Sequence, residues 1–330
     1  MPEPMKPNPL APEPLQTAVL FLVFNRPDTT ARVFEAIRQA KPPRLYVASD
    51  GPREGREGEV DRVSHVRSIA TAVDWPCEVK TLFRATNLGC KYAVSVAITW
   101  FFEQEERGII LEDDCLPHPD FFSFCETLLK RYDDDGRVSV ITGTNFQNGI
   151  QRGDGSYYFS RYNHVWGWAS WRRAWQYYDR DLSFWPEWRR SESLLTDFPD
   201  SVERRYWEKI FDRMHAQQID TWDYQWTASV WYHGGLTATP NVNLVSNIGF
   251  GEDSTHTKSA DSPLAGMETS AIGNLTHPSI VACDQVADRY VFDQNFGGKN
   301  KRFPRSVLYF PRRVGGYLYR IIKGVLPDAR

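Results

Sequence analysis

The chain has 330 residues, with 41% hydrophobic and 25% charged residues, which is typical of a globular protein with room for one large α/β domain or two subdomains. The formal net charge of −3 excludes a general nucleic-acid-binding protein. The cysteines are scattered and no apolar run reaches the roughly 20 residues of a membrane span, so we expect a cytoplasmic protein with free thiols and no disulfide framework or cysteine zinc site.

The first half of the chain alternates short apolar runs with amphipathic segments. After a proline-rich leader over residues 1–16, which we expect to be disordered, we predict strands within residues 17–27, 44–52, 77–89 and 107–114, and helices over residues 28–41, 60–73 and 90–105. Strands that alternate with helices predict an α/β fold with a mostly parallel, doubly wound sheet flanked by helices. Ligands of such sheets lie beyond the carboxyl ends of the strands, so the polar residues that follow each strand are candidate site residues.

The second half of the chain differs from the first in composition. A helix from residue 120 and a strand over residues 138–146 are followed by a Trp- and Tyr-rich segment, residues 157–231, which we interpret as mostly helical. This segment forms either a second lobe or an extension of the sheet. Its tryptophans are typical both of carbohydrate and nucleotide sites and of large cores, and the sequence leaves these two interpretations open. Residues 234–257 are strand-like and then Gly-rich, which indicates a mobile loop.

Three consecutive carboxylates, Glu112, Asp113 and Asp114, end the apolar strand "GIILEDD". Adjacent negative charges repel one another, so a fold gains nothing from them unless a cation or donor groups neutralise them. Hard divalent cations choose oxygen ligands and in turn hold phosphates, which predicts an Mn²⁺ or Mg²⁺ site that binds a diphosphate. A solvated acidic loop and a helix N-cap are the alternatives.

Four other residues are candidates for the same site. Arg26 and Asp50 follow strands and are predicted to contact the base, ribose or phosphates of a nucleotide, with a local salt bridge or turn as the alternative. Asp223 in "DTWDYQW" has tryptophans on both sides, an apolar setting that suits a general base, although an Asp at the start of a helix is also typical of an N-cap. His256 in "GFGEDSTHT" is either a metal ligand or phosphate contact on a closing loop, or a surface histidine.

Together these segments resemble the GT-A glycosyltransferases, and within them N-acetylglucosaminyltransferase I and its bacterial relatives. The most specific match is "LEDDCLPHPDFF", which has the Glu-Asp-Asp of that family followed by proline, Asp and two Phe. Six other segments match as well. "FNRPDTTARVFEAIR" resembles the first strand and helix of the family, "YVASDG" the base-contacting strand, and "ITGTNFQ" the strand after the acidic motif. "HVWGWASWRRAW" resembles the acceptor-side Gly-Trp segment, "TWDYQW" the Trp-Asp segment, and "GFGEDSTHT" the loop that closes over the donor. The resemblance covers residues 17–257.

The resemblance implies a GT-A type, Rossmann-like fold and a role for each candidate. The metal ligands would be Asp114 and His256. The donor-binding residues would be Arg26, Asp50, Glu112, Asp113 and Ser254. The acceptor-side residues would be Trp168 and Trp222, and the catalytic base would be Asp223. The chain would divide into the leader, a nucleotide-sugar-binding subdomain (17–150), an aromatic-rich acceptor-side subdomain (151–285) with a closing loop (249–257), and a basic C-terminal tail (286–330).

The implied activity is inverting, metal-dependent transfer of a sugar from a nucleotide diphosphate donor, such as UDP-N-acetylglucosamine, to a hydroxyl of a glycan or glycoconjugate. The chain departs from the family at the base segment, where Tyr224 follows Asp223 and the family has a second acid. Two alternatives remain. One is a sugar-nucleotide nucleotidyltransferase, although "VFNRPDTT" lacks the glycines of its phosphate loop. The other is a non-catalytic glycan-binding module on the same fold.

The C-terminal tail is basic. Residues 299–330 contain nine Lys or Arg and one Asp, a balance of +8, interleaved with aromatic and aliphatic residues. Such segments bind anionic membrane surfaces, which predicts a peripheral position at the inner face of a membrane. The alternative is a basic segment that packs on the body of the protein.

Overall fold

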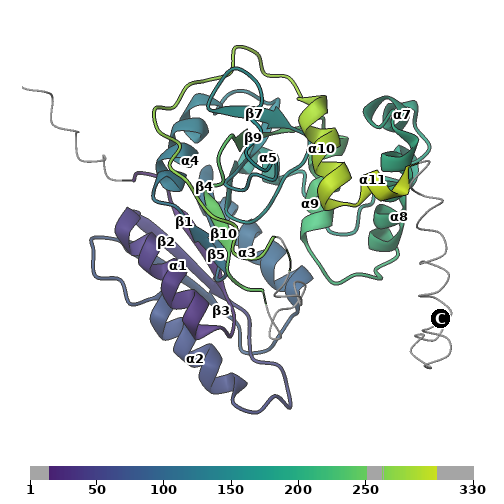
Figure 1. Ribbon diagram of the computed structural model, residues 1–330. Coiled ribbons are helices and arrows are strands. Elements are labelled where there is room, and N and C mark those ends of the chain that lie inside the picture. Colours follow the sequence, from purple (N-terminus) through teal and green to yellow (C-terminus); the bar gives the residue numbers. More distant parts are fainter. Residues whose placement is uncertain (1–14, 251–261, 263, 303–330) are drawn as a thin grey trace, which may run out of the picture.

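An eight-stranded sheet runs through the molecule (Figure 1). The computed structural model describes residues 15–250, 262 and 264–302. Within them the strand order is β3-β2-β1-β4-β8-β6-β9-β7, and a small antiparallel sheet pairs β5 with β10. The strands are β1 (Val19–Val23), β2 (Arg44–Ser49), β3 (Glu78–Phe83), β4 (Arg107–Glu112), β5 (Cys115–Pro117), β6 (Val138–Thr142), β7 (Tyr157–Ser160), β8 (Trp168–Trp171), β9 (Leu236–Pro240) and β10 (Val245–Asn247).

Helices flank both faces of the sheet. They are α1 (Pro27–Ala40), α2 (Glu59–Ala70), α3 (Cys90–Gln104), α4 (Asp120–Arg131), α5 (Arg172–Trp175), α6 (Trp185–Trp188), α7 (Glu192–Asp197), α8 (Ser201–His215), α9 (Asp223–Tyr232), α10 (Gln285–Asn295) and α11 (Gly298–Lys301). Along β1, Val19, Phe21 and Val23 pack into the core with α1, α2 and α4, whereas Leu20 and Leu22 pack into the core with α3 and the later helices. Both faces of this strand are buried, which is why β1 is an unbroken apolar run.

The predicted α/β architecture is confirmed. The pairs β1-β2, β2-β3, β1-β4 and β6-β9 are parallel, and β4-β8, β6-β8 and β7-β9 are antiparallel, so four of the seven neighbouring pairs in the large sheet of the described residues are parallel. The strands and helices predicted between residues 17 and 146 are all present. The result is a Rossmann-like, mostly parallel sheet between layers of helices.

The Trp-rich segment contributes two strands besides its helices, and of its two interpretations the extension of the sheet is the one observed. β8 inserts between β4 and β6 and is antiparallel to both, and β7 forms the edge beside β9. All four residues of β8 are buried. A strand that is buried on both faces has no alternation of apolar and polar residues, so its pattern does not distinguish it from a buried helix. The sheet therefore extends into the second half of the chain.

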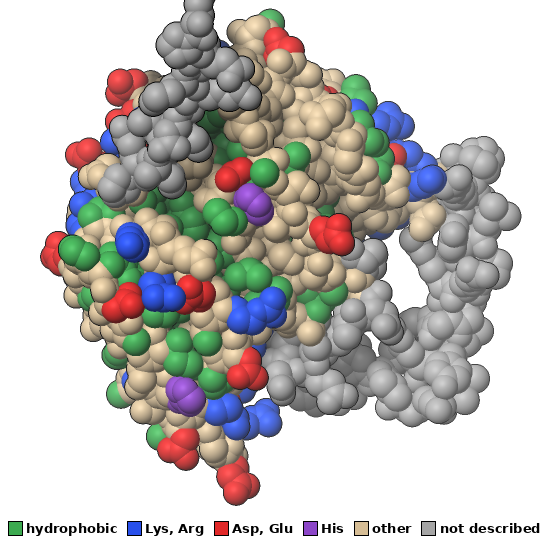
Figure 2. Space-filling view, turned by 60° about the vertical axis from the view of Figure 1, so that its left-hand side comes forward, with side chains coloured by type: hydrophobic (Ala, Val, Ile, Leu, Met, Phe, Trp, Pro, Cys, Tyr) green, Lys and Arg blue, Asp and Glu red, His purple; other side chains and the backbone are tan. Residues whose placement is uncertain are grey.

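The beginning of the predicted tail packs on the body. Val291 and Phe292 of α10 are buried, and Arg302 is paired with Asp200. Residues 303–330 and the first fourteen residues lie outside the described part of the chain, so membrane contact and the disordered leader remain predictions. No helix among the described residues is long and apolar enough to cross a membrane. On the face drawn in Figure 2, basic and acidic side chains are interspersed.

Gly108 of β4 provides a test of the packing of α3 on the sheet. A Cβ at Gly108 would overlap the ring of Phe101 on α3. We expect Gly108→Ala to lower the free energy of unfolding by about 1–3 kcal/mol, because the overlap displaces the helix. Gly136→Ala is the matched control, since a Cβ there meets no atom within 4 Å. Urea denaturation measures both variants, and equal stabilities would contradict this packing.

Candidate active site

The carboxyl ends of β2, β1 and β4 lie side by side at one edge of the sheet. β1 lies between β2 and β4 and is parallel to both, so all three strands end at the same edge. Asp50 follows β2, Arg26 follows β1, and Asp113 and Asp114 follow β4. The structure thus brings together groups that are far apart in the sequence.

Arg26 connects the two aspartates. Its Nη2 donates to Asp113 Oδ1 at 2.5 Å, and its Nη1 lies 3.1 Å from Asp114 Oδ2. The second oxygen of Asp113 accepts the backbone N–H of Phe24 at 3.1 Å. Asp113 is 3% exposed and Asp114 is 8% exposed, so these ion pairs are largely removed from water. Loss of either partner would leave an uncompensated buried charge, and the cluster therefore links the end of β1 to the end of β4.

The cluster carries more negative than positive charge. Burial, together with the charges of Asp114 and Asp113, raises the pKa of Glu112. Burial also raises the pKa of Asp113, although Arg26 opposes this rise. Burial by itself would lower the pKa of Arg26, but the neighbouring carboxylates raise it overall. One guanidinium faces three carboxyl groups, so a further cation at this edge would reduce their mutual repulsion.

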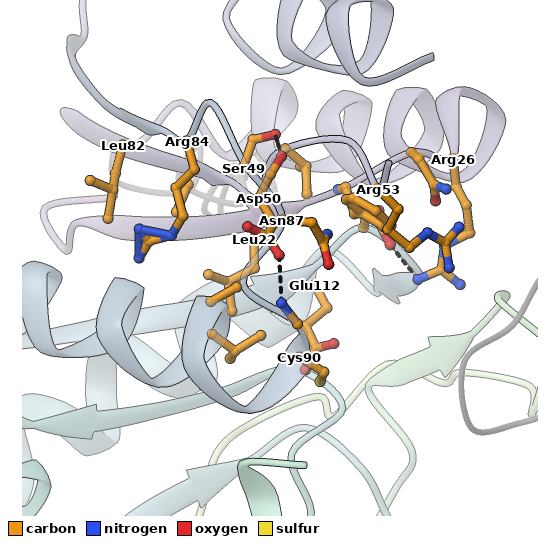
Figure 3. Close-up of a pocket in the computed structure, with 18 of the residues that line it drawn as sticks. Leu22, Arg26, Ser49, Asp50, Arg53, Leu82, Arg84, Asn87, Cys90 and Glu112 are labelled. Atoms are coloured by element: carbon orange, nitrogen blue, oxygen red, sulfur yellow. Dashed lines mark hydrogen bonds and ion pairs between the residues drawn. The ribbon is translucent and has the colours of Figure 1, made fainter. Parts of the chain in front are cut away.

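A cavity of about 250 Å³, which we call the strand-end pocket, opens beside this cluster (Figure 3). Its apolar lining includes Leu22, Ala48, Leu82 and Val94. In Figure 3, Arg84 and Arg26 lie at opposite ends of the pocket, and Asp50 and Asn87 lie between them. An apolar lining with a few charged groups is the usual composition of a small-molecule site, and guanidinium groups are suited to phosphate oxygens.

Asp50 orders a loop at the pocket rather than presenting a free carboxylate. It accepts backbone N–H groups of Gly51 at 2.9 Å, Leu88 at 3.0 Å and Gly89 at 3.1 Å. Burial raises the pKa of Asp50, although these donors oppose the rise. By contrast, Nη2 of Arg84 is buried and has no hydrogen-bond partner among the described residues. Such a donor is available to an acceptor atom of a bound molecule.

Glu59, the first residue of α2, holds two walls of the strand-end pocket. Its carboxylate accepts Nδ2 of Asn25 at 2.8 Å, and the backbone N and Nε of Arg53 at 2.7 Å and 3.0 Å. Both partners line the pocket. The hydrogen bonds from Arg53 are the main cause that lowers the pKa of Glu59 to about 2. The position at a helix N-terminus favours a carboxylate as well.

A wider cavity of about 710 Å³, which we call the central cleft, adjoins the strand-end pocket. Arg26, Glu112 and Asp114 line it, and so do Asp220 and Asp223 from the segment that leads into α9. Arg26, Glu112 and Asp220 also line the strand-end pocket, so the two cavities share walls. The predicted base therefore lies in the same cleft as the predicted metal ligand, although they are 109 positions apart in the chain.

The position of Asp223 is set by its neighbours. It is the first residue of α9, and the hydroxyl of Thr221 donates to its Oδ1. The preceding Trp222 is buried and stacks on Trp168, with ring centroids 5.8 Å apart. The core tryptophans thus anchor this turn, while Asp223 itself stays partly exposed to the cleft.

Apart from Trp168, the predicted site residues line the strand-end pocket, line the central cleft, or lie outside the described residues. Those that line the strand-end pocket are Arg26, Asp50, Glu112 and Asp113, and those that line the central cleft are Arg26, Glu112, Asp114, Trp222 and Asp223. Ser254 and His256 lie outside the described residues, so their roles remain predictions.

Trp168 requires a correction. It is 0% exposed in β8 and has no surface to offer to an acceptor. Trp166 lines the central cleft in its place. Gly167, with a φ of +64°, separates the two tryptophans, and its backbone conformation favours glycine. The "VWGW" motif is therefore at the site, but through its first tryptophan.

Sequence reasoning also missed Arg84, Glu59 and Asp220. Arg84 directly follows β3, so the strand-end rule that selected Arg26 would have selected it too. In the sequence, Glu59 cannot be distinguished from any other acid in the first turn of a helix. Asp220 accepts the backbone N–H of Lys91 at 3.2 Å and so ties the turn before α9 to the start of α3. Nothing in the sequence indicates the contact of Glu59 with Asn25 or that of Asp220 with Lys91, because each joins distant segments of the chain.

The acidic cluster fits a divalent cation through the chemistry of its oxygen donors. Within the described residues, no group of three or more His, Cys, Asp or Glu side chains is placed to hold a metal. Mg²⁺, however, is commonly bound through one or two carboxylates together with substrate phosphates. Asp114 faces the central cleft and belongs to a cluster with excess negative charge. The donor set therefore suits an ion that arrives with a phosphate-bearing ligand.

Comparison with known proteins yields no family assignment. No protein-family model matches the chain, and no curated protein matches it. HddC from Yersinia pseudotuberculosis is similar over 52% of this chain and 86% of that chain, at 12% identity and a TM-score of 0.31. A UDP-glucose pyrophosphorylase complexed with UDP-glucose is similar over 44% of this chain and 62% of that chain, at 10% identity and a TM-score of 0.25. An inositol-1-phosphate CTP transferase from T. maritima is similar over 68% of this chain and 85% of that chain, at 10% identity and a TM-score of 0.35. Similarities this low carry no inference about activity.

The network around Glu59 makes stability depend on pH. The folded pKa of about 2 lies below the ordinary 4.5, so the stabilisation is fully present above pH 4.5 and is lost as the pH falls toward 2. We expect Glu59→Gln to lower the free energy of unfolding by about 1–2 kcal/mol at pH 7, because solvent screens the partly exposed Arg53, and we expect the difference from wild type to narrow as the pH falls below 4.5. Urea titrations between pH 7 and pH 3.5 test this. Glu57→Gln, an exposed acid two residues earlier, is the control, and a gap that stays constant with pH would contradict the assignment.

Proposed function

We propose that the protein is a GT-A type, inverting glycosyltransferase that moves a sugar from a nucleotide diphosphate donor to a hydroxyl of a glycan or glycoconjugate. One observation carries the proposal: Asp223 lines the same cleft as Arg26 and Asp114, next to a pocket with an apolar lining. A proton acceptor and a group that binds the departing phosphates are the two requirements of a single displacement at an anomeric carbon.

The chain's own residues would act as follows. The strand-end pocket would hold the nucleoside between its apolar lining and the polar groups Arg84 and Asn87, and Arg26 would stabilise the charge that develops on the diphosphate. Asp223 would take the proton of the acceptor hydroxyl as the oxygen bonds to the anomeric carbon and the bond to the phosphate oxygen breaks. The hydrogen bond from Thr221 would hold one oxygen of Asp223, so that the other receives the proton. When bound, Mn²⁺ or Mg²⁺ held by Asp114 would neutralise the departing diphosphate.

A sugar-nucleotide nucleotidyltransferase is the alternative, and two of the similar structures are named as a pyrophosphorylase and a CTP transferase. Two features favour glycosyl transfer. No glycine separates β1 from α1, which begins at Pro27, a residue without an N–H for a phosphate. Furthermore, the nucleophile of nucleotidyl transfer to a sugar phosphate is an ionised oxygen, which needs no general base. A carboxylate in the same cleft as the acidic cluster suits a reaction in which a hydroxyl must be deprotonated.

Donor binding can be tested by thermal unfolding of the full chain with UDP-, GDP- and dTDP-sugars, with and without Mn²⁺. We expect at least one UDP-sugar to raise the Tm by about 2 °C or more in the presence of Mn²⁺, because a ligand of the native state stabilises it by mass action. Asp114→Asn should abolish the part of the shift that depends on Mn²⁺. If none of the nucleotide sugars moves the midpoint, the proposal fails, and a shift with nucleoside triphosphates alone supports nucleotidyl transfer.

The catalytic base can be tested by Asp223→Asn, which keeps the shape of the side chain but removes the proton acceptor. We expect kcat to fall by roughly 10²-fold or more while the donor-induced shift in Tm persists. Release of the nucleoside diphosphate measures turnover with the donor and a panel of glycoside acceptors. Asp220→Asn is the comparison, since it changes the other carboxylate of the same turn. A larger loss in Asp220→Asn than in Asp223→Asn would reassign the base.

A further inference from the structure

A third cavity, of about 210 Å³, is also lined by Asp223. We call it the aromatic pocket, because its walls include the rings of Phe146, Trp166, Trp207 and Phe296. Trp166 and Asp223 line both this pocket and the central cleft. The three cavities therefore follow one another, with Asp223 at the junction of the second and the third.

Asn163 supplies an unpartnered amide to the aromatic pocket. The residue is 7% exposed, and neither its Oδ1 nor its Nδ2 has a hydrogen-bond partner among the described residues. Buried amides in folded proteins nearly always have partners, so an unpartnered amide in the lining of a cavity is a candidate contact for a ligand. An amide that offers one of each is complementary to two hydroxyl groups of one molecule.

The described residues that line the aromatic pocket supply no positive charge. None of the described residues that line it is Lys or Arg. His164 lines it and packs edge-on against Phe146 at 4.5 Å, and burial lowers the pKa of this imidazole to about 3, so it is neutral near pH 7. The carboxylate of Asp223 lies at the entrance. A phosphate or carboxylate group in this pocket would meet a negative charge and no cation to offset it.

We propose that the aromatic pocket binds an uncharged sugar ring of the acceptor, with the amide of Asn163 on two of its hydroxyl groups. The apolar C–H face of the ring would lie against the aromatic walls, and the reacting hydroxyl would point toward Asp223. The assignment rests on the proposed function for the role of Asp223. It specifies the substrate further: the acceptor ends in a neutral hexose or N-acetylhexosamine, not in a uronic acid or a sugar phosphate.

The test is direct binding of small glycosides to the full chain, measured by ligand-observed NMR without any donor. The probes are the methyl glycosides of glucose, galactose, mannose and N-acetylglucosamine, with methyl glucuronide and glucose 6-phosphate as charged counterparts. We expect at least one neutral glycoside to bind and the charged ones not to bind. Asn163→Leu, which keeps the size of the side chain but removes the amide, should raise the Kd at least tenfold. Phe296→Ala, which removes one wall, should raise it as well.

The matched control is Asn274→Leu, the same change at an exposed position that does not line the pocket. It should leave the Kd unchanged. Retention of the nucleotide-sugar shift in Tm by Asn163→Leu verifies that the variant is folded. The inference is overturned if no neutral glycoside binds, if charged sugars bind equally well, or if Asn163→Leu binds like wild type. Because the glycoside titration needs no donor, its failure is separate from a failure of the nucleotide-sugar titration, which would overturn the proposed function instead.

Discussion

The pairing of Arg26 with Asp113 and Asp114 is the interaction on which the candidate site depends. It joins the ends of two neighbouring parallel strands at the edge where the chain places most of its polar strand-end residues. The guanidinium compensates only part of the negative charge, and burial together with the charges of Asp114 and Asp113 raises the pKa of Glu112. The remaining negative charge favours a ligand that brings a cation.

The three cavities differ in the charged residues that line them. The strand-end pocket contains guanidinium groups, including an unpartnered nitrogen of Arg84. The central cleft has carboxylates on both sides. The aromatic pocket has neither Lys nor Arg among the described residues of its lining. Asp223 lines both the central cleft and the aromatic pocket, which is where donor and acceptor would meet in the proposed function. The Trp-rich segment contributes to this site because its buried rings anchor the turn before α9.

The first half of the fold and the acidic end of the site were predictable because they depend on local patterns. Short apolar runs followed by polar residues identify buried parallel strands, and the carboxyl ends of such strands meet at one edge. Arg26, Asp50 and the Glu112–Asp114 run were found by this rule, and Arg84 obeys it as well. By contrast, β8 could not be recognised, because a strand covered on both faces carries no alternation.

The sequence by itself determined the α/β architecture, the edge of the sheet that carries the acids and the choice of Asp223 as a candidate base. Only the tertiary structure decided that Trp166 rather than Trp168 faces the cleft, that Asp50 is engaged by backbone N–H groups, and that Asn163 lacks a partner. The physical reason is that patterns along a chain report burial and local turns, whereas hydrogen-bond partners and cavity walls come from segments far apart in sequence.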